Sequence, residues 1–163
     1  MPSPTLPLRD KALPLLQMLQ TLLNHLQAPA TLAARVFVGL AFFRSGLTKI
    51  NDWETTLALF MDEYHVPFLP PHVAAVAGTC GELFFPVLLV LGLCGRLSAL
   101  SLFFVNILAV VSLSEIEPAA LQQHQFWGAL LLVVVLWGPG KWSLDAWWWP
   151  RFVARGGGAK ASL

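Results

Sequence analysis

Four long hydrophobic stretches divide this chain, and each is about long enough to cross a lipid bilayer. They cover residues 31–50, about 72–93, about 97–113 and 118–137. At about 1.5 Å per residue, a helix of twenty residues spans roughly 30 Å, the thickness of the hydrocarbon core. The pattern therefore predicts four transmembrane helices.

The last of these stretches reaches this length only if it includes a polar start. The apolar run "FWGALLLVVVLW" alone is too short to cross. Pro118 suits the first position of a helix, and the sequence Gly138-Pro139-Gly140 suits its end. Counting from Pro118 to Trp137 gives a full span, and this places His124 inside the helix.

The segment in front of the first span has a different pattern. Residues 12–27, "ALPLLQMLQTLLNHLQ", combine leucines at helical spacing with Gln17, Gln20, Asn24 and Gln27 on much of the other face. This is too polar for a span and predicts an amphipathic helix lying on the membrane surface. We expect three parts: residues 1–30 as flexible start and interfacial helix, 31–145 as the membrane domain, and 146–163 as a Trp-rich, then Gly-rich tail.

The composition supports a membrane location. The chain is 56% hydrophobic and 12% charged, whereas a soluble domain carries about 25% charged residues. We therefore predict an all-α membrane protein, a bundle of four transmembrane helices preceded by an amphipathic surface helix. The bilayer is the expected partner, and the formal net charge of +1 gives no indication of nucleic-acid binding.

The charges between the spans predict the orientation. The segments after the first and third spans are acidic, with Asp52, Glu54, Asp62, Glu63, Glu115 and Glu117. The basic residues lie on the other side, at Arg9, Lys11, Arg96, Arg151, Arg155 and Lys160. Because short cytoplasmic loops carry an excess of Lys and Arg, we expect a membrane protein with both termini in the cytoplasm.

Each predicted span carries one polar residue in its outer half or near the midplane. These residues are Arg44, Glu82, Asn106 and His124. A charged side chain near a helix centre costs about 2.5–3.5 kcal/mol, a cost usually offset by pairing inside the bundle. The sequence thus predicts a polar pocket open toward the outer face, in which Arg44 pairs with Glu82.

The cations have an alternative interpretation. Arg44 and Lys49 would reach the outer headgroups by extending along the helix, and Arg35 would do the same on the cytoplasmic side. Glu82 lies too deep for this, so it is paired, protonated or functional. A purely structural Arg–Glu pair agrees with the sequence as well as a ligand or proton site does.

The remaining polar residues leave the chemistry open. Asn106 suits an interhelical hydrogen bond, and His124 suits either a helix interface or a functional role. Lys49, His65 and His72 are candidates for the rim of the pocket. No spacing typical of a metal site is present, so metal binding is undetermined. No catalytic motif or cofactor motif is evident either, which leaves enzyme activity open.

Four segments in order carry a family resemblance: "RVFVGLAFFRSGLTKI", "YHVPFLPP", "GELFFPVLLVLGLCGRLSAL" and "HQFWGALLLVVVLWGPGKWSLD". Over about residues 31–145 the chain resembles the DoxX family of small four-helix bacterial membrane proteins. The order and spacing of these segments are more specific than any one of them. The resemblance carries these residues onto the chain: Arg35, Gly39, Arg44, Gly46, Lys49, Glu82, Gly92, Arg96, His124, Gly138, Gly140, Ser143 and Asp145.

The resemblance implies two kinds of function. The family takes its name from a subunit associated with an archaeal quinol oxidase and thiosulfate–quinone electron transfer, and other members are linked to oxidative-stress complexes. The region "EYHVPFLPP" to "CGELFFP" is similar to a subgroup associated with genes for copper-binding modified peptides. We expect an accessory protein or small-solute carrier serving metal or oxidative-stress handling. The alternative is a membrane subunit that works with other membrane or redox subunits of a quinone-linked oxidoreductase.

Overall fold

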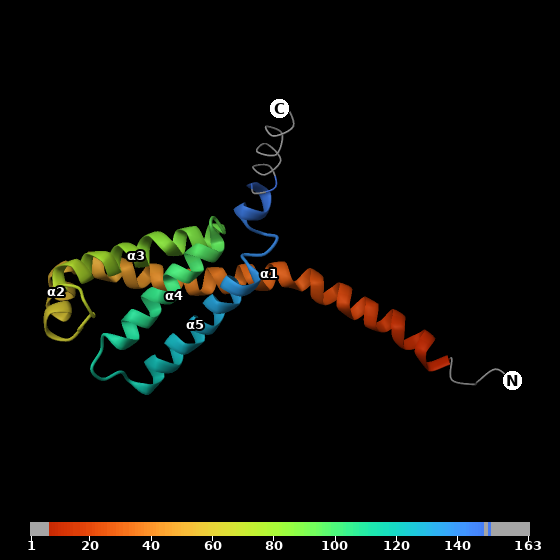
Figure 1. Ribbon diagram of the computed structural model, residues 1–163, viewed down its shortest axis with the longest axis horizontal. Coiled ribbons are helices and arrows are strands. Elements are labelled where there is room, and N and C mark those ends of the chain that lie inside the picture. Colours follow the sequence, from red (N-terminus) through yellow and green to blue (C-terminus); the bar gives the residue numbers. More distant parts are fainter. Residues whose placement is uncertain (1–6, 149, 151–163) are drawn as a thin grey trace, which may run out of the picture.

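The protein is a helical bundle with one helix that extends far beyond it (Figure 1). The computed structural model describes residues 7–148 and residue 150, with side chains from Ala12 onward. Its main helices are α1 (Pro7–Asn51), α2 (Trp53–Asp62), α3 (Pro71–Leu91), α4 (Gly95–Val111) and α5 (Pro118–Trp137). The described residues form no strand, only an isolated bridge between Tyr64 and Leu113. The prediction of an all-α membrane bundle is confirmed.

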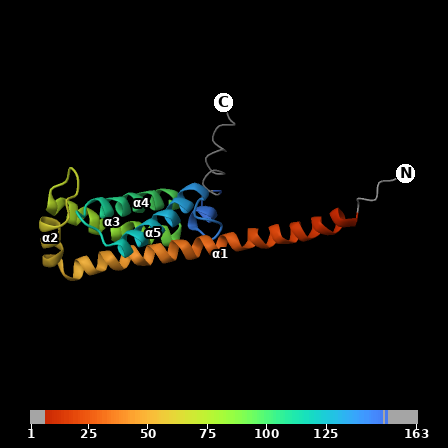
Figure 2. The same cartoon turned by 90° about the horizontal axis from the view of Figure 1, so that it is seen from below.

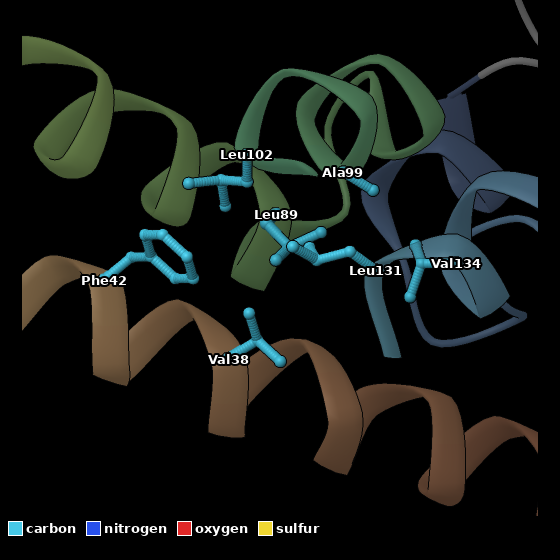
Figure 3. Packing of buried hydrophobic residues seen from close by; sticks show 7 residues of the cluster. All are labelled: Val38, Phe42, Leu89, Ala99, Leu102, Leu131 and Val134. Atoms are coloured by element: carbon cyan, nitrogen blue, oxygen red, sulfur yellow. The ribbon is translucent and has the colours of Figure 1, made fainter. Parts of the chain in front are cut away.

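Four of these helices close into a ring. α1 packs against α3, α3 against α4, α4 against α5, and α5 returns to α1. The side chains that fill the centre come from all four helices (Figure 3): Val38, Phe42, Leu89, Ala99, Leu102, Leu131 and Val134. Since lipid tails are as apolar as leucine, packing of this kind is what holds such helices together.

Three of the four helices have the length and apolar composition of a membrane span on their own. These are α1, α3 and α5, while α4 is a shorter apolar helix of 17 residues. Seventeen residues is about the lower limit for a span. Because α4 lies in the ring between α3 and α5, it completes the four-helix bundle. The bounds of α5 are those predicted from Pro118 and Gly138.

The structure differs from the sequence prediction at the junction before the first span. α1 is one helix of 45 residues with Pro29 inside it, and no break separates residues 12–27 from the span (Figure 2). A proline removes one backbone hydrogen bond but leaves the bonds of its neighbours in place. The hydroxyl of Thr31 also donates to the carbonyl of Gln27 at 2.7 Å across this turn.

A short helix that we did not predict follows α1. Asp52 caps α2, since its carboxylate accepts a hydrogen bond from the backbone N–H of Thr55 at 3.1 Å. Phe60 is buried against Ala74 and Ala75 of α3. An Asp at the position before the first helical residue is a helix-start signal that the sequence carried. α2 therefore folds back over the N-terminal end of α3 instead of forming an open loop.

Glycines set the close approach of α1 and α3. A Cβ on Gly39 would lie 2.6 Å from Cγ2 of Val90, and one on Gly46 would lie 2.8 Å from Cγ of Leu83. Both distances are shorter than atoms can approach. The two helices pack so closely because these positions have no side chain, a common device where helices meet in membranes.

A polar cluster connects distant segments of the chain at the end of the bundle opposite α2. Arg35 is 1% exposed, and its Nη2 donates to the carbonyl of Trp142 at 2.5 Å. The carboxylate of Asp145 accepts the backbone N–H groups of Cys94 and Gly95 at 2.8 and 2.7 Å. The expectation that Arg35 extends toward the headgroups is wrong, because it lies one turn before Val38 on the inward face.

This cluster leads to a first prediction. Replacing Asp145 by Ala should lower the stability of the protein by about 0.5–2 kcal/mol, because the first N–H groups of α4 lose their acceptor. The thermal midpoint of the purified protein in detergent measures this. Lys141→Ala, at an exposed neighbouring position, is the control and should leave the midpoint unchanged. Equal midpoints for both variants would contradict the capping role.

Candidate functional site

A lysine and a glutamate form an ion pair inside the bundle. Glu82 of α3 is 6% exposed. The Nζ of Lys49, in the last turn of α1, donates to its Oε1 at 2.6 Å and to its Oε2 at 2.5 Å. The third ammonium hydrogen bond goes to the hydroxyl of Ser45 at 3.1 Å. All three donors of the lysine are used, and the pair is neutral as a unit.

The cation beside Glu82 is therefore not the one we predicted. Arg44 is exposed on the outside of the bundle. It is two residues from both Phe42 and Gly46, so it points about 200° away from the face that packs on α3. Lys49 is three residues after Gly46 and lies on that face. The prediction of an Arg44–Glu82 pair is wrong. It matched the expected depths of the two residues in the membrane but ignored the direction in which the Arg44 side chain leaves its helix.

The ion pair lines a cavity, which we call the central cavity. Its volume is about 260 Å³. It lies among α1, α3, α4 and α5 and the loops that follow α2 and α4, and its polar lining includes Ser45, Lys49, Tyr64, Glu82, Ser112 and His124. The remaining wall is mostly aliphatic, with Phe60. Thus Glu82 and His124, chosen from the sequence as pocket residues, do meet in one cavity, and Lys49 takes the place of Arg44.

Asn106 holds His124 in place from behind the cavity. Its Nδ2 donates to the backbone carbonyl of His124 at 3.0 Å, and its Oδ1 is 2.8 Å from the Nδ1 of the imidazole. A carboxamide oxygen only accepts, so Nδ1 carries the proton. In the neutral ring Nε2 is then left as an acceptor. Asn106, buried at 5% exposure, is an interhelical clamp and does not line the central cavity.

The loops after α2 and α4 cover the mouth of the cavity. The backbone N–H of His65 donates to the carbonyl of Ser112 at 2.8 Å, beside the bridge between Tyr64 and Leu113. The ring of Tyr64 packs on Phe60 with centroids 5.0 Å apart. Burial raises the pKa of Tyr64, and nearby carboxylates raise it further. The phenol therefore keeps its proton and its capacity to donate a hydrogen bond near the mouth.

A second hollow reaches the ion pair from the α2 side, and we call it the entrance groove. It has a volume of about 320 Å³ and carries several hydroxyl groups, those of Ser45, Thr48, Thr55, Thr56 and Tyr64. Lys49 lines both hollows. His65 and His72, expected at the rim together with Lys49, are exposed and line neither one. His65, in the loop after α2, and His72, in the first turn of α3, both lie at the surface.

A third hollow lies between α4 and α5, and we call it the lipid-side groove. It has a volume of about 430 Å³ and an almost wholly apolar lining, with residues such as Ile107, Val111 and Leu132. His124 and Asn106 are among its few polar residues. The imidazole of His124 thus lines both the central cavity and a surface that faces the hydrocarbon region.

The part of the chain that the structure describes brings no three His, Cys, Asp or Glu side chains together as a metal site. The acidic group and the imidazole that line the cavity belong to Glu82 and His124, and Glu82 is already paired with Lys49. The arrangement offers hydrogen-bond donors and acceptors to a bound molecule.

The clamp between α4 and α5 gives a second prediction. Asn106→Leu should cost about 1–3 kcal/mol of stability, because it leaves the Nδ1–H of His124 without a partner in an apolar surrounding. The thermal midpoint in detergent is the measurement. Ile107→Leu, at the exposed neighbouring position, is the control. A midpoint for Asn106→Leu equal to that of the control would show that the clamp contributes nothing.

Comparisons with known proteins agree with this architecture. The sequence profile of the DoxX family matches residues 30–115, more than half of the chain. A Haemophilus influenzae protein described as uncharacterized is 31% identical over 121 residues, which cover 70% of this chain and 80% of that protein. No solved structure matches the chain. The matched region holds Lys49, Glu82 and Asn106, while His124 lies beyond it. The protein therefore belongs to the DoxX family.

Proposed function

We propose that this protein is an inner-membrane carrier for a small polar solute, which it binds in the central cavity. The observation that carries the proposal is the position of the Lys49–Glu82 pair. A purely structural pair has no need of open space beside it, whereas this pair lines a cavity of about 260 Å³ together with His124. Ion pairs at membrane depth that line a cavity are typical of substrate pathways.

The chemistry of the cavity favours a neutral or zwitterionic solute. Lys49 and Glu82 cancel each other's charge, so a solute with net charge would leave one charge in excess inside the bundle. Nε2 of His124 and the free lone pairs of Glu82 accept hydrogen bonds, and the phenol of Tyr64 donates one. The volume lies just below the usual range of about 300–1,000 Å³ for ligand pockets, which favours a small molecule.

The entrance groove supplies the route. Ser45, Lys49 and Tyr64 line both it and the central cavity, so a solute that enters between α1 and α2 meets the ammonium group first. The acidic loops beside α2 lie outside the cell in the orientation we propose, with both termini in the cytoplasm. The cavity then opens toward the outer face.

Solute entry into proteoliposomes tests the carrier function. Vesicles containing the full chain are mixed with glycerol, urea or glycine, and swelling is followed by light scattering. We expect faster swelling with at least one of these probes than in vesicles with the double variant Lys49→Met with Glu82→Leu. That variant removes both charges, so no buried charge is left without a partner. Arg44→Met, which changes an exposed cation, should behave like the unchanged protein. Equal rates for all three proteins and for empty vesicles would refute the carrier function.

The lipid-side groove favours a second candidate function, that of a membrane subunit in a quinone-linked oxidoreductase complex. A lipid-soluble molecule could lie among Ile107, Val111 and Leu132 and place its polar end against His124. This function would require redox partner subunits.

A quinone with a short tail separates the two functions. Added decyl-ubiquinone should raise the thermal midpoint of the protein and not that of His124→Phe if the second function is correct. Haem or flavin absorbance in the visible spectrum of the protein purified from its own membrane would favour it as well. No shift and no absorbance would leave the solute carrier as the better proposal.

A further inference from the structure

The N-terminal third of α1 presents an apolar stripe that no other part of the described chain covers. Every residue from Ala12 to Gln27 is exposed, and Ala28 is the first buried residue of the helix. Leu15, Leu19 and Leu22 are 68%, 49% and 53% exposed. A contiguous apolar surface of this kind marks an interaction site.

The direction of this segment keeps it out of the membrane plane. The bundle ends near Thr31, where Gly140 lies against the threonine, and near Arg35, which binds the carbonyl of Trp142. α1 continues past this end as one helix, which bends where it leaves the bundle (Figure 1). The sixteen residues 12–27 add about 24 Å of helix at the standard rise. Since spans cross the bilayer steeply, a continuous helix projects away from the membrane.

The spacing of the stripe is that of a coiled coil. Ala12, Leu15, Leu19, Leu22 and Leu26 follow one another at intervals of three, four, three and four residues. An apolar repeat of three and four residues keeps one seam of a helix facing a parallel partner. Leu16 and Leu23 lie next to this seam and widen it.

The lack of charged residues in this segment argues against the membrane surface as the partner of the apolar stripe. Helices that lie in the membrane interface are rich in Lys and Arg on their polar face. Residues 12–34 contain no Asp, Glu, Lys or Arg, and their polar side chains before Ala28 are Gln17, Gln20, Thr21, Asn24, His25 and Gln27. The segment therefore lacks the attraction to anionic headgroups on which such helices depend.

We propose that residues 12–27 of α1 form a parallel coiled coil with the same segment of a second copy of this chain. Both copies cross the membrane in the same direction, so their projecting helices are parallel and in register. Leu15, Leu19, Leu22 and Leu26 then meet their own counterparts at the seam. The interaction would hold two membrane bundles side by side through a contact outside the bilayer.

Disulfide formation between single cysteines in the full chain tests this geometry. The two free cysteines, Cys80 and Cys94, are first replaced by serine. Leu19→Cys and Leu22→Cys place a thiol at the seam, while Gln17→Cys and Asn24→Cys place it on the opposite face. On mild oxidation of native membranes, we expect several-fold more cross-linked dimer from the seam positions than from the outer ones. Equal yields from both faces, or none from the seam, would overturn the proposal.

A second measurement covers the case in which a seam cysteine itself weakens the contact. In nanodiscs, Leu19→Lys with Leu22→Lys should convert dimers to monomers, whereas Gln17→Lys with Asn24→Lys adds the same charge and should leave them intact. A monomeric unchanged protein would overturn the proposal. So would quenching of a fluorophore at residue 19 by a lipid-borne quencher, because that result places the stripe on the membrane surface.

Discussion

Replacing Glu82 by Leu will destabilise the protein strongly, by about 3–5 kcal/mol if the ammonium of Lys49 is left without a partner in the bundle. Lys49→Met strands the carboxylate instead and should also be costly, although Glu82 can reduce the loss by taking up a proton. The double variant Lys49→Met with Glu82→Leu leaves no stranded charge. It should therefore recover a large part of the stability lost in either single variant.

The thermal midpoints of the unchanged protein, the two single variants and the double variant, all in the same detergent, form the test. A double-mutant cycle isolates the interaction between residues in contact. Arg44→Met serves as the control, since this arginine is exposed and its loss should change stability by no more than about 0.5 kcal/mol. Losses that simply add in the double variant would show that Lys49 and Glu82 do not interact.

Replacing Gly46 by Ile should separate α1 from α3 and disrupt the site as well. A Cβ at this position would lie 2.8 Å from Cγ of Leu83 and 3.2 Å from Cβ of Glu82. Added atoms in a packed contact of this kind cost about 1–3 kcal/mol, and more where the backbone cannot move. Because Lys49 follows one turn later, the displaced helix also carries its ammonium away from the carboxylate.

Size complementation tests this contact. The clash of a new Cβ at position 46 is mainly with the side chain of Leu83, so Gly46→Ala should be partly rescued by Leu83→Ala, although Leu83→Ala alone loses packing. Leu47→Ile, at the exposed neighbouring position, is the control for a β-branched residue in this turn. If Gly46→Ile has the same midpoint as this control, the close approach of α1 and α3 is incorrect.

Most of the helical architecture could be read from the sequence. The apolar lengths predicted the spans, and Pro118 with Gly138 predicted the bounds of α5. These signals are local, because a helix in lipid satisfies its own backbone and its length must match the bilayer. Glu82 and His124, selected by the same reasoning, both line the central cavity.

The partner of Glu82 could have been found from the sequence but was missed. Gly39 and Gly46 already indicated the packing face of α1, and Lys49 follows Gly46 by three residues on that face. Arg44 was chosen because it matched the expected depth of Glu82, and this ignored the direction in which each side chain leaves the helix. Combining depth with helical direction would have selected the lysine.

Other features depend on contacts between distant segments, and the sequence alone did not determine them. Asp145 caps a helix that begins fifty residues earlier, and the loop after α2 pairs with the loop before α5 at Ser112. The central cavity exists because α2 and these loops close over the ends of the spans. Local sequence fixes helix lengths and faces through backbone hydrogen bonding and hydropathy, whereas cavities and capping depend on which helices pack together, because only packing brings distant side chains within contact distance.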